Sequence, residues 1–114
     1  MAGFEVTTSA QANRTVVALA GECDLSVSGE LTSALLGALG EGREVVVDLA
    51  ALQFLDSSGV HGLVTAYHAA KRDGVPLRLV NAGGVVADVL DLTGVGELLA
   101  APSGEPSREG LENV

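Results

Sequence analysis

A short polar segment between two apolar stretches limits the folds that this chain can adopt. Residues 45–49 (Val-Val-Val-Asp-Leu) are nearly continuous in apolar side chains, which is typical of a buried central strand. Residues 60–71 have helical periodicity, with a predicted inner stripe of Val60, Leu63, Val64, Tyr67 and Lys71 and with Thr65, His68 and Arg72 pointing away. The segment 54–59 (Phe-Leu-Asp-Ser-Ser-Gly) therefore predicts a strand, a tight connection and a helix in succession.

The remaining segments extend this unit to an α/β domain with a small mixed β-sheet and helices packed against it. Alternating or apolar runs predict strands over residues 4–8, 15–20, 75–80 and 97–101, and helical stripes cover residues 31–39 and 85–92. Ser26 is the expected N-cap of the first helix. The segment Gly40-Glu41-Gly42 is expected to end this helix. The order of strands and helices is that of a single α/β layer structure.

Chain length and composition indicate one domain with an aliphatic core. The chain has 114 residues, of which 47% are hydrophobic, with only two Phe, one Tyr and no Trp. This length suits a single core, which we place over residues 1–101. Residues 102–114 are rich in Pro, Ser, Gly and Glu, and we expect a polar, mobile tail there.

The charge of the chain narrows the classes of partner. Six Lys and Arg residues stand against 15 Asp and Glu residues, which gives a net charge of −9. Nucleic acids and anionic membranes are disfavoured, because both need cationic residues to replace counterions, whereas a basic protein partner is compatible. The sequence has no apolar run of membrane-spanning length and no N-terminal signal pattern, so a cytoplasmic location is expected.

Cys23 is the single cysteine, so it can form neither an internal disulfide nor a thiolate cage. Its neighbours Glu22 and Asp24 would raise the pKa of the thiol, which favours a small packing residue over a redox group. His61 and His68 are too far apart on one helix to share a metal. Phosphate-loop and dinucleotide motifs are absent, and neither a metal nor a cofactor is expected.

The segment Asp56-Ser57-Ser58 places two hydroxyls at the start of a predicted helix. Asp56 is suited to the N-cap, which would leave Ser57 at the exposed first position. Backbone N–H groups without helical partners and the positive end of the dipole can stabilise a phosphate there. The competing interpretation is that these residues only cap the helix, and spacing alone favours it.

Three motifs together resemble the STAS family, and within it the bacterial anti-anti-sigma factors. The segment 54–59 is similar to the family's phosphoacceptor segment. Residues 21–24 (Gly-Glu-Cys-Asp) look like its Gly-Glu-x-Asp, and residues 92–95 (Leu-Thr-Gly-Val) look like its Leu-Thr-Gly-Leu. The motifs follow in the family's order and intervals over roughly residues 4–100.

The resemblance implies a STAS-type fold and a phosphorylation switch at Ser57, with Ser58 the weaker candidate. The implied partners are an anti-sigma factor that is also a serine kinase and a PPM-type serine phosphatase. The unphosphorylated protein would bind the anti-sigma factor and free a sigma factor, and phosphorylation would end this binding. The implied switch surface consists of Glu22, Asp24, Asp56, Ser58, Gly59 and His61.

His61 departs from the family pattern, in which glycine usually occupies this position. The residue lies one predicted turn after Ser57 on the same face, so it is either a plain surface histidine or a contact for the phosphate. An enzyme using Ser57 as nucleophile and His61 as base is disfavoured, because a helix N-terminus destabilises an imidazolium. The alternative function within the fold is a scaffold or transport-associated interaction module without obligatory phosphorylation.

Overall fold

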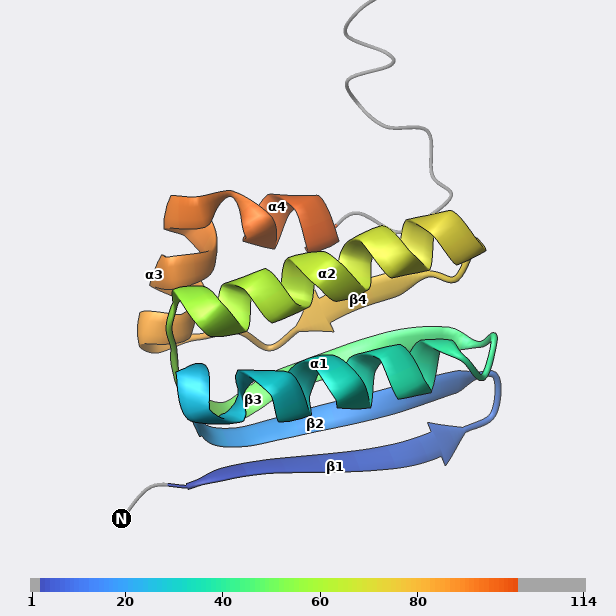
Figure 1. Cartoon of the computed structure of the whole chain (residues 1–114), viewed down its shortest axis with the longest axis horizontal. Coiled ribbons are helices and arrows are strands. Elements are labelled where there is room, and N and C mark those ends of the chain that lie inside the picture. The colour runs from blue at the N-terminus through green and yellow to red at the C-terminus, as the bar shows by residue number, and fades with distance from the viewer. Residues whose placement is uncertain (1–2, 101–114) are drawn as a thin grey trace, which may run out of the picture.

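Four strands and four helices follow one another in the computed structural model, which describes residues 3–100 (Figure 1). In chain order they are β1 (Phe4–Gln11), β2 (Arg14–Cys23), α1 (Leu25–Leu39), β3 (Glu44–Leu55), α2 (Ser57–Asp73), β4 (Leu77–Val80), α3 (Gly84–Thr93) and α4 (Val95–Ala100). The predicted tail over residues 102–114 lies outside the described residues.

The sheet is mixed, as the sequence predicted. Its strand order is β1-β2-β3-β4, in which β1 and β2 form an antiparallel hairpin and β2, β3 and β4 are parallel. The hairpin turns over Ala12 and Asn13, with Gln11 paired to Arg14. Parallel strands connected through helices bring the carboxyl ends of β2 and β3 to the same edge of the sheet.

The helices α1 and α2 lie side by side across the sheet, and their inner faces join the strands in one aliphatic core (Figure 1). The largest fully buried side chains include Leu19, Leu31, Leu35, Leu49, Leu55 and Leu63. The helix α3 packs against β3, and α4 packs against β4 and α3. Within residues 3–100, no helix combines the length and the apolar content that crossing a bilayer requires.

The buried face of α2 differs from the predicted stripe. The buried residues of this helix are Gly59, Val60, Gly62, Leu63, Ala66, Ala69 and Ala70, whereas Val64 and Tyr67 are half-buried and Lys71 is exposed. Small residues form most of this face because α1 approaches closely. A Cβ atom on Gly62 would lie 2.7 Å from Thr32 Oγ1 of α1.

Three predicted elements need correction. The strand predicted over residues 45–49 runs to Leu55, because β2 pairs with it as far as Cys23 across two register shifts. The predicted last strand over residues 97–101 is wrong: residues 95–100 form the helix α4. The N-cap of α1 is Asp24 rather than Ser26, which lies inside the first turn.

Candidate functional site

The candidate site lies where β2 and β3 end and α1 and α2 begin. Cys23 pairs with Leu55 as the last residues of the two strands, and the backbone N–H of Asp56 donates to the carbonyl of Cys23 at 3.2 Å. A helix starts two residues later in each chain segment, at Leu25 and at Ser57, so the two helix N-termini lie at the same end of the molecule (Figure 1). We call the exposed residues around them the helix tip: Glu22, Asp24, Ser57 and His61.

Asp56 is the N-cap of α2, as predicted. Its Oδ1 accepts hydrogen bonds from the backbone N–H groups of Ser58 (3.0 Å) and Gly59 (3.2 Å) and from the Ser58 hydroxyl (2.6 Å). The Ser58 hydroxyl, and to a smaller extent these N–H groups, lower the pKa of the Asp56 carboxyl against the opposing effect of burial. A carboxylate is therefore fixed directly beside Ser57 at neutral pH.

Ser57 occupies the first position of α2 and is exposed. Among the described residues, no side-chain hydrogen bond involves its hydroxyl, whereas the Ser58 hydroxyl is held by Asp56 at 2.6 Å. The two adjacent serines thus differ: Ser58 completes the cap, and Ser57 presents a free hydroxyl to solvent.

The backbone donors of this helix start are less available than the sequence suggested. Asp56 already accepts from the N–H groups of Ser58 and Gly59, which are two of the donors expected to stabilise a phosphate. A phosphate on Ser57 would meet the ionised Asp56 and would find these two donors occupied. This helix start would consequently stabilise the new charge less than an uncapped one would.

Gly59 lies beneath the helix tip rather than on its surface, because it is buried. A Cβ atom at this position would come within 2.4 Å of Leu55 Cδ1 and 3.0 Å of Cys23 Sγ. The glycine thereby lets α2 start close against the ends of β2 and β3. Its contribution to the candidate site is to set the position of Ser57.

Cys23 is fully buried below the tip, as a packing residue should be. Burial, with smaller contributions from the carboxylates of Asp56 and Asp24, raises the pKa of its thiol to about 11. The thiol is therefore protonated at physiological pH, which agrees with the packing role predicted from its acidic neighbours.

Asp24 repeats at α1 the arrangement that Asp56 makes at α2. Its Oδ1 accepts from the backbone N–H (3.0 Å) and the hydroxyl (2.6 Å) of Ser26. Glu22, two residues earlier, is exposed and stands opposite Phe54 in the sheet register. Three acidic residues thus surround the start of the two helices: Glu22, Asp24 and Asp56.

Two apolar residues of this end were not predicted from the sequence as site residues. Leu25 begins α1 and is 76% exposed, and Phe54 near the end of β3 is 39% exposed. The sequence did not indicate that these two residues are exposed, because the apolar pattern around each is also compatible with burial. His61, one turn into α2, is exposed. The helix tip with the neighbouring Leu25 and Phe54 therefore combines carboxylates, apolar surface, one hydroxyl and one imidazole.

Comparison with known proteins gives a family and a set of related folds. The family model for the STAS domain matches residues 4–108. No curated protein matches the chain significantly by sequence.

The fold recurs in several solved structures. An anti-sigma factor antagonist from Mycobacterium paratuberculosis is 22% identical with a TM-score of 0.77, covering 98% of this chain and 94% of its own. A putative anti-sigma factor antagonist from Thermotoga maritima is 18% identical with a TM-score of 0.71, covering 96% and 93%. The Bacillus cell fate determinant SpoIIAA in its phosphorylated form is 18% identical with a TM-score of 0.65, covering 97% and 98%. At these identities the likeness concerns the fold.

Proposed function

Since the chain belongs to the STAS domain family, we propose that it is an anti-sigma factor antagonist whose binding is switched off by phosphorylation of Ser57. In this proposal the unmodified protein binds an anti-sigma factor that is also a serine kinase, and this binding frees a sigma factor. The chain is then a binding module and a phosphorylation substrate, not an enzyme. Structural similarity to anti-sigma factor antagonists supports the role.

The observation that carries the proposal is the free hydroxyl of Ser57 at an exposed helix start. A kinase must reach the oxygen, and a hydroxyl without a hydrogen-bond partner can be presented without breaking the cap. Ser58 does not meet this condition, because its hydroxyl donates to Asp56 at 2.6 Å. The geometry therefore favours Ser57 over Ser58 as the phosphoacceptor.

The proposed reaction is transfer of a phosphoryl group from ATP bound to the partner kinase. A bond forms between Ser57 Oγ and the γ-phosphorus, the bond from that phosphorus to the β,γ-bridging oxygen breaks, and ADP leaves. A base on the kinase takes the hydroxyl proton. A PPM-type phosphatase reverses the modification by hydrolysis, which returns the serine and releases inorganic phosphate.

Phosphorylation would act through charge at an interface rather than by refolding this domain. The modification adds about −1.5 to −2 charge at pH 7 beside Asp56 and at the same tip as Glu22 and Asp24. In free protein, water screens this repulsion. In a complex, the dianion would have to lose its hydration next to carboxylates and to apolar surface such as Leu25, which strongly disfavours binding.

The first test is phosphosite mapping on the protein isolated from its native cell, with and without phosphatase treatment. We expect one phosphate on Ser57 that is lost in Ser57→Ala and retained in the matched variant Ser58→Ala. A chain that carries no phosphate at Ser57 under several growth conditions would overturn the switch. It would favour the alternative of a STAS scaffold or transport-associated module.

The second test measures binding of the purified anti-sigma factor kinase to three forms of the chain. Wild type and Ser57→Ala should bind with similar affinity, and Ser57→Asp should bind at least tenfold more weakly because it places a fixed charge at the switch position. Equal affinities for the Ala and Asp variants would contradict the mechanism.

A further inference from the structure

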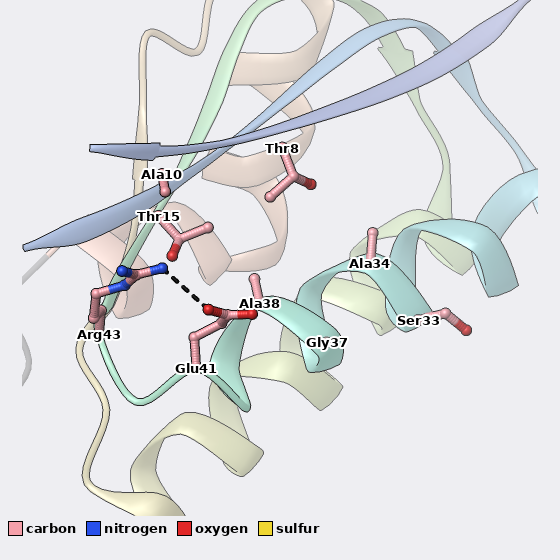
Figure 2. Close-up of a pocket in the computed structure, with 9 residues that line it drawn as sticks. All are labelled: Thr8, Ala10, Thr15, Ser33, Ala34, Gly37, Ala38, Glu41 and Arg43. Atoms are coloured by element: carbon pink, nitrogen blue, oxygen red, sulfur yellow. Dashed lines mark hydrogen bonds and ion pairs between the residues drawn. The ribbon is translucent and has the colours of Figure 1, made fainter. Parts of the chain in front are cut away.

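A hollow of about 440 Å³ lies between the β1–β2 hairpin and the C-terminal half of α1, far along α1 from the helix tip. Thr8, Ala10 and Thr15 of the hairpin face Ala34, Gly37 and Ala38 of α1 across it (Figure 2). Arg43 and Glu41 lie at one end. The hollow exists because α1 covers only part of the inner face of β1. On that face Phe4 and Val6 pack against the core, whereas Thr8 and Ala10 further along the strand are exposed.

Thr15 is the buried polar side chain of this hollow. It is 3% exposed, and its hydroxyl has no hydrogen-bond partner in the described part of the chain. Buried hydroxyls in proteins nearly always have a partner, so an orphan calls for a physical reason. Figure 2 shows the hydroxyl pointing toward the guanidinium of Arg43 at the end of the hollow.

Arg43 supplies a second orphan donor. Its Nη2 forms an ion pair with Glu41 at 3.0 Å, but its buried Nε has no partner among residues 3–100. The ion pair is partly exposed, with 38% of the arginine side chain and 55% of the glutamate side chain accessible. Such pairs are weak, so the Arg43 side chain can shift slightly and open both orphan groups, its own Nε and the Thr15 hydroxyl, to the hollow.

These groups define the chemistry of a matching ligand. Among the described residues neither Thr15 Oγ1 nor Arg43 Nε has a partner. Arg43 Nε can only donate and the Thr15 hydroxyl can donate or accept, so one acceptor oxygen of a ligand would satisfy both. Glu41 already balances the charge of Arg43, so a second carboxylate would be repelled. The side chains of Ala10, Ala34 and Ala38 offer a small apolar wall. We propose that the hollow binds a small uncharged acyl compound, with its carbonyl oxygen on Thr15 and Arg43 and its aliphatic part against these alanines.

This site is independent of the proposed phosphorylation switch. The hollow lies at the C-terminal end of α1, whereas Asp24 and Ser57 lie where α1 and α2 begin. The variant Ser57→Asp should therefore bind the acyl compound as the wild type does. If Ser57 is not phosphorylated, the inference about the hollow still stands. If the hollow does not bind the acyl compound, the proposed switch still stands.

The test is an NMR titration of the ¹⁵N-labelled full chain with butyramide as the probe. We expect saturable shifts of backbone amides around Ala10, Thr15 and Ala38, with a dissociation constant on the order of millimolar for so small a ligand. Butyrate, its charged counterpart, should bind at least tenfold more weakly. Thr15→Val should weaken butyramide binding by about three- to tenfold, the range for one lost hydrogen bond.

Matched controls make each result decisive. Thr7 precedes Thr8 in β1, so its side chain lies on the face of the sheet away from the hollow. Thr7→Val makes the same change of side chain there and should leave binding unchanged. Absence of saturable shifts would mean that the hollow holds solvent only, and wild-type affinity in Thr15→Val would show that the hydroxyl is not used. Either result overturns the proposal, as does butyrate binding equal to or tighter than that of butyramide.

Discussion

Asp24 and Asp56 cap neighbouring helices through the same contacts: each Oδ1 accepts from the backbone N–H and the hydroxyl of the serine two residues later. The helices differ at the residue between, which is Leu25 in α1 and Ser57 in α2. Each cap uses its own serine hydroxyl, so within residues 3–100 the Ser57 hydroxyl keeps no side-chain hydrogen bond. The duplicated cap thus places an apolar side chain and a modifiable hydroxyl at equivalent positions of two adjacent helices.

The Asp56 cap should make stability depend on pH in the acid range. Its carboxyl has a lowered pKa in the folded chain, so its contribution is fully present above the ordinary value of 3.8. The contribution is lost as the pH falls through the lower folded value, because the carboxyl is then protonated in the folded and the unfolded state alike. Urea unfolding of wild type and Asp56→Asn from neutral pH to below about pH 4 should show a smaller acid loss in the variant. Parallel curves for the two proteins would contradict this.

Gly59 should resist substitution by alanine although it lies in a helix. The added Cβ would come within 2.4 Å of Leu55 Cδ1, and Leu55 is itself 1% exposed and cannot move aside freely. We expect Gly59→Ala to lower the free energy of unfolding by about 1–3 kcal/mol, the usual cost of overpacking. Gly29→Ala in α1 is the control: its Cβ would meet nothing within 4 Å, so it should stabilise by about 0.5–1 kcal/mol. Denaturant unfolding distinguishes the two, and equal effects would rule out the steric account.

The sequence was most informative where local chemistry decides the structure. The Asp56 cap of α2 and the end of α1 at Gly40, both predicted, depend on short-range rules. Gly74 adopts a left-handed conformation (φ 71°) and donates to the carbonyls of Ala70 and Lys71, as a C-terminal glycine commonly does.

Features decided by distant parts of the chain could not be predicted. Residues 50–55 join β3 because β2 pairs with them across register shifts. Their buried residues, Leu52 and Leu55, are three apart rather than at the two-residue spacing of a regular strand. Residues 95–100 are helical, and Val95 and Leu99 pack in the core from one face of this helix. Their four-residue interval also places two residues on one face of a strand, so the sequence did not distinguish the two. The hollow at Thr15 depends on how far β1 extends past α1, which no local pattern specifies.

Thr15→Val should stabilise the protein in the absence of ligand. The hydroxyl of Thr15 is buried without a partner in the described part of the chain, and burying an unpaired hydroxyl costs about 1–3 kcal/mol. Valine keeps the shape and removes that cost, so the free energy of unfolding should rise by about 1 kcal/mol in urea. Thr7→Val, at an exposed position of the same sheet, should change it by less than about 0.5 kcal/mol. A destabilised Thr15→Val would show that the hydroxyl has a partner in solution, such as a bound water.

Cys23 should be inert toward thiol reagents in the folded protein. Its side chain is fully buried, and burial together with Asp56 and Asp24 raises the pKa of the thiol to about 11, so little thiolate exists at pH 8. Alkylation by iodoacetamide, followed by mass spectrometry, should be slow in buffer and rapid in denaturing urea. Rapid alkylation of the native protein would contradict the packing role, and Cys23→Ala provides the blank.

Alanine substitutions of the adjacent residues Ser57 and Ser58 should change the stability of the protein by different amounts. Ser58→Ala removes a hydroxyl that donates to Asp56 at 2.6 Å in a half-buried setting, so we expect a loss of about 1 kcal/mol in the free energy of unfolding. Ser57→Ala removes an exposed hydroxyl without such a bond, and the change should stay within about 0.5 kcal/mol. Denaturant unfolding of both variants at neutral pH is the measurement.

The same comparison decides how cleanly the switch can be tested. If Ser57→Ala leaves stability unchanged, any loss of phosphorylation in that variant reports the missing acceptor oxygen and not a disturbed helix start. If instead Ser57→Ala destabilises as much as Ser58→Ala, the Ser57 hydroxyl belongs to the cap, and a kinase would have to break a helix contact to reach it. The structural premise of the proposal, that the Ser57 hydroxyl is not part of the helix cap, would then be wrong. This would hold even if Ser57 is phosphorylated in the cell.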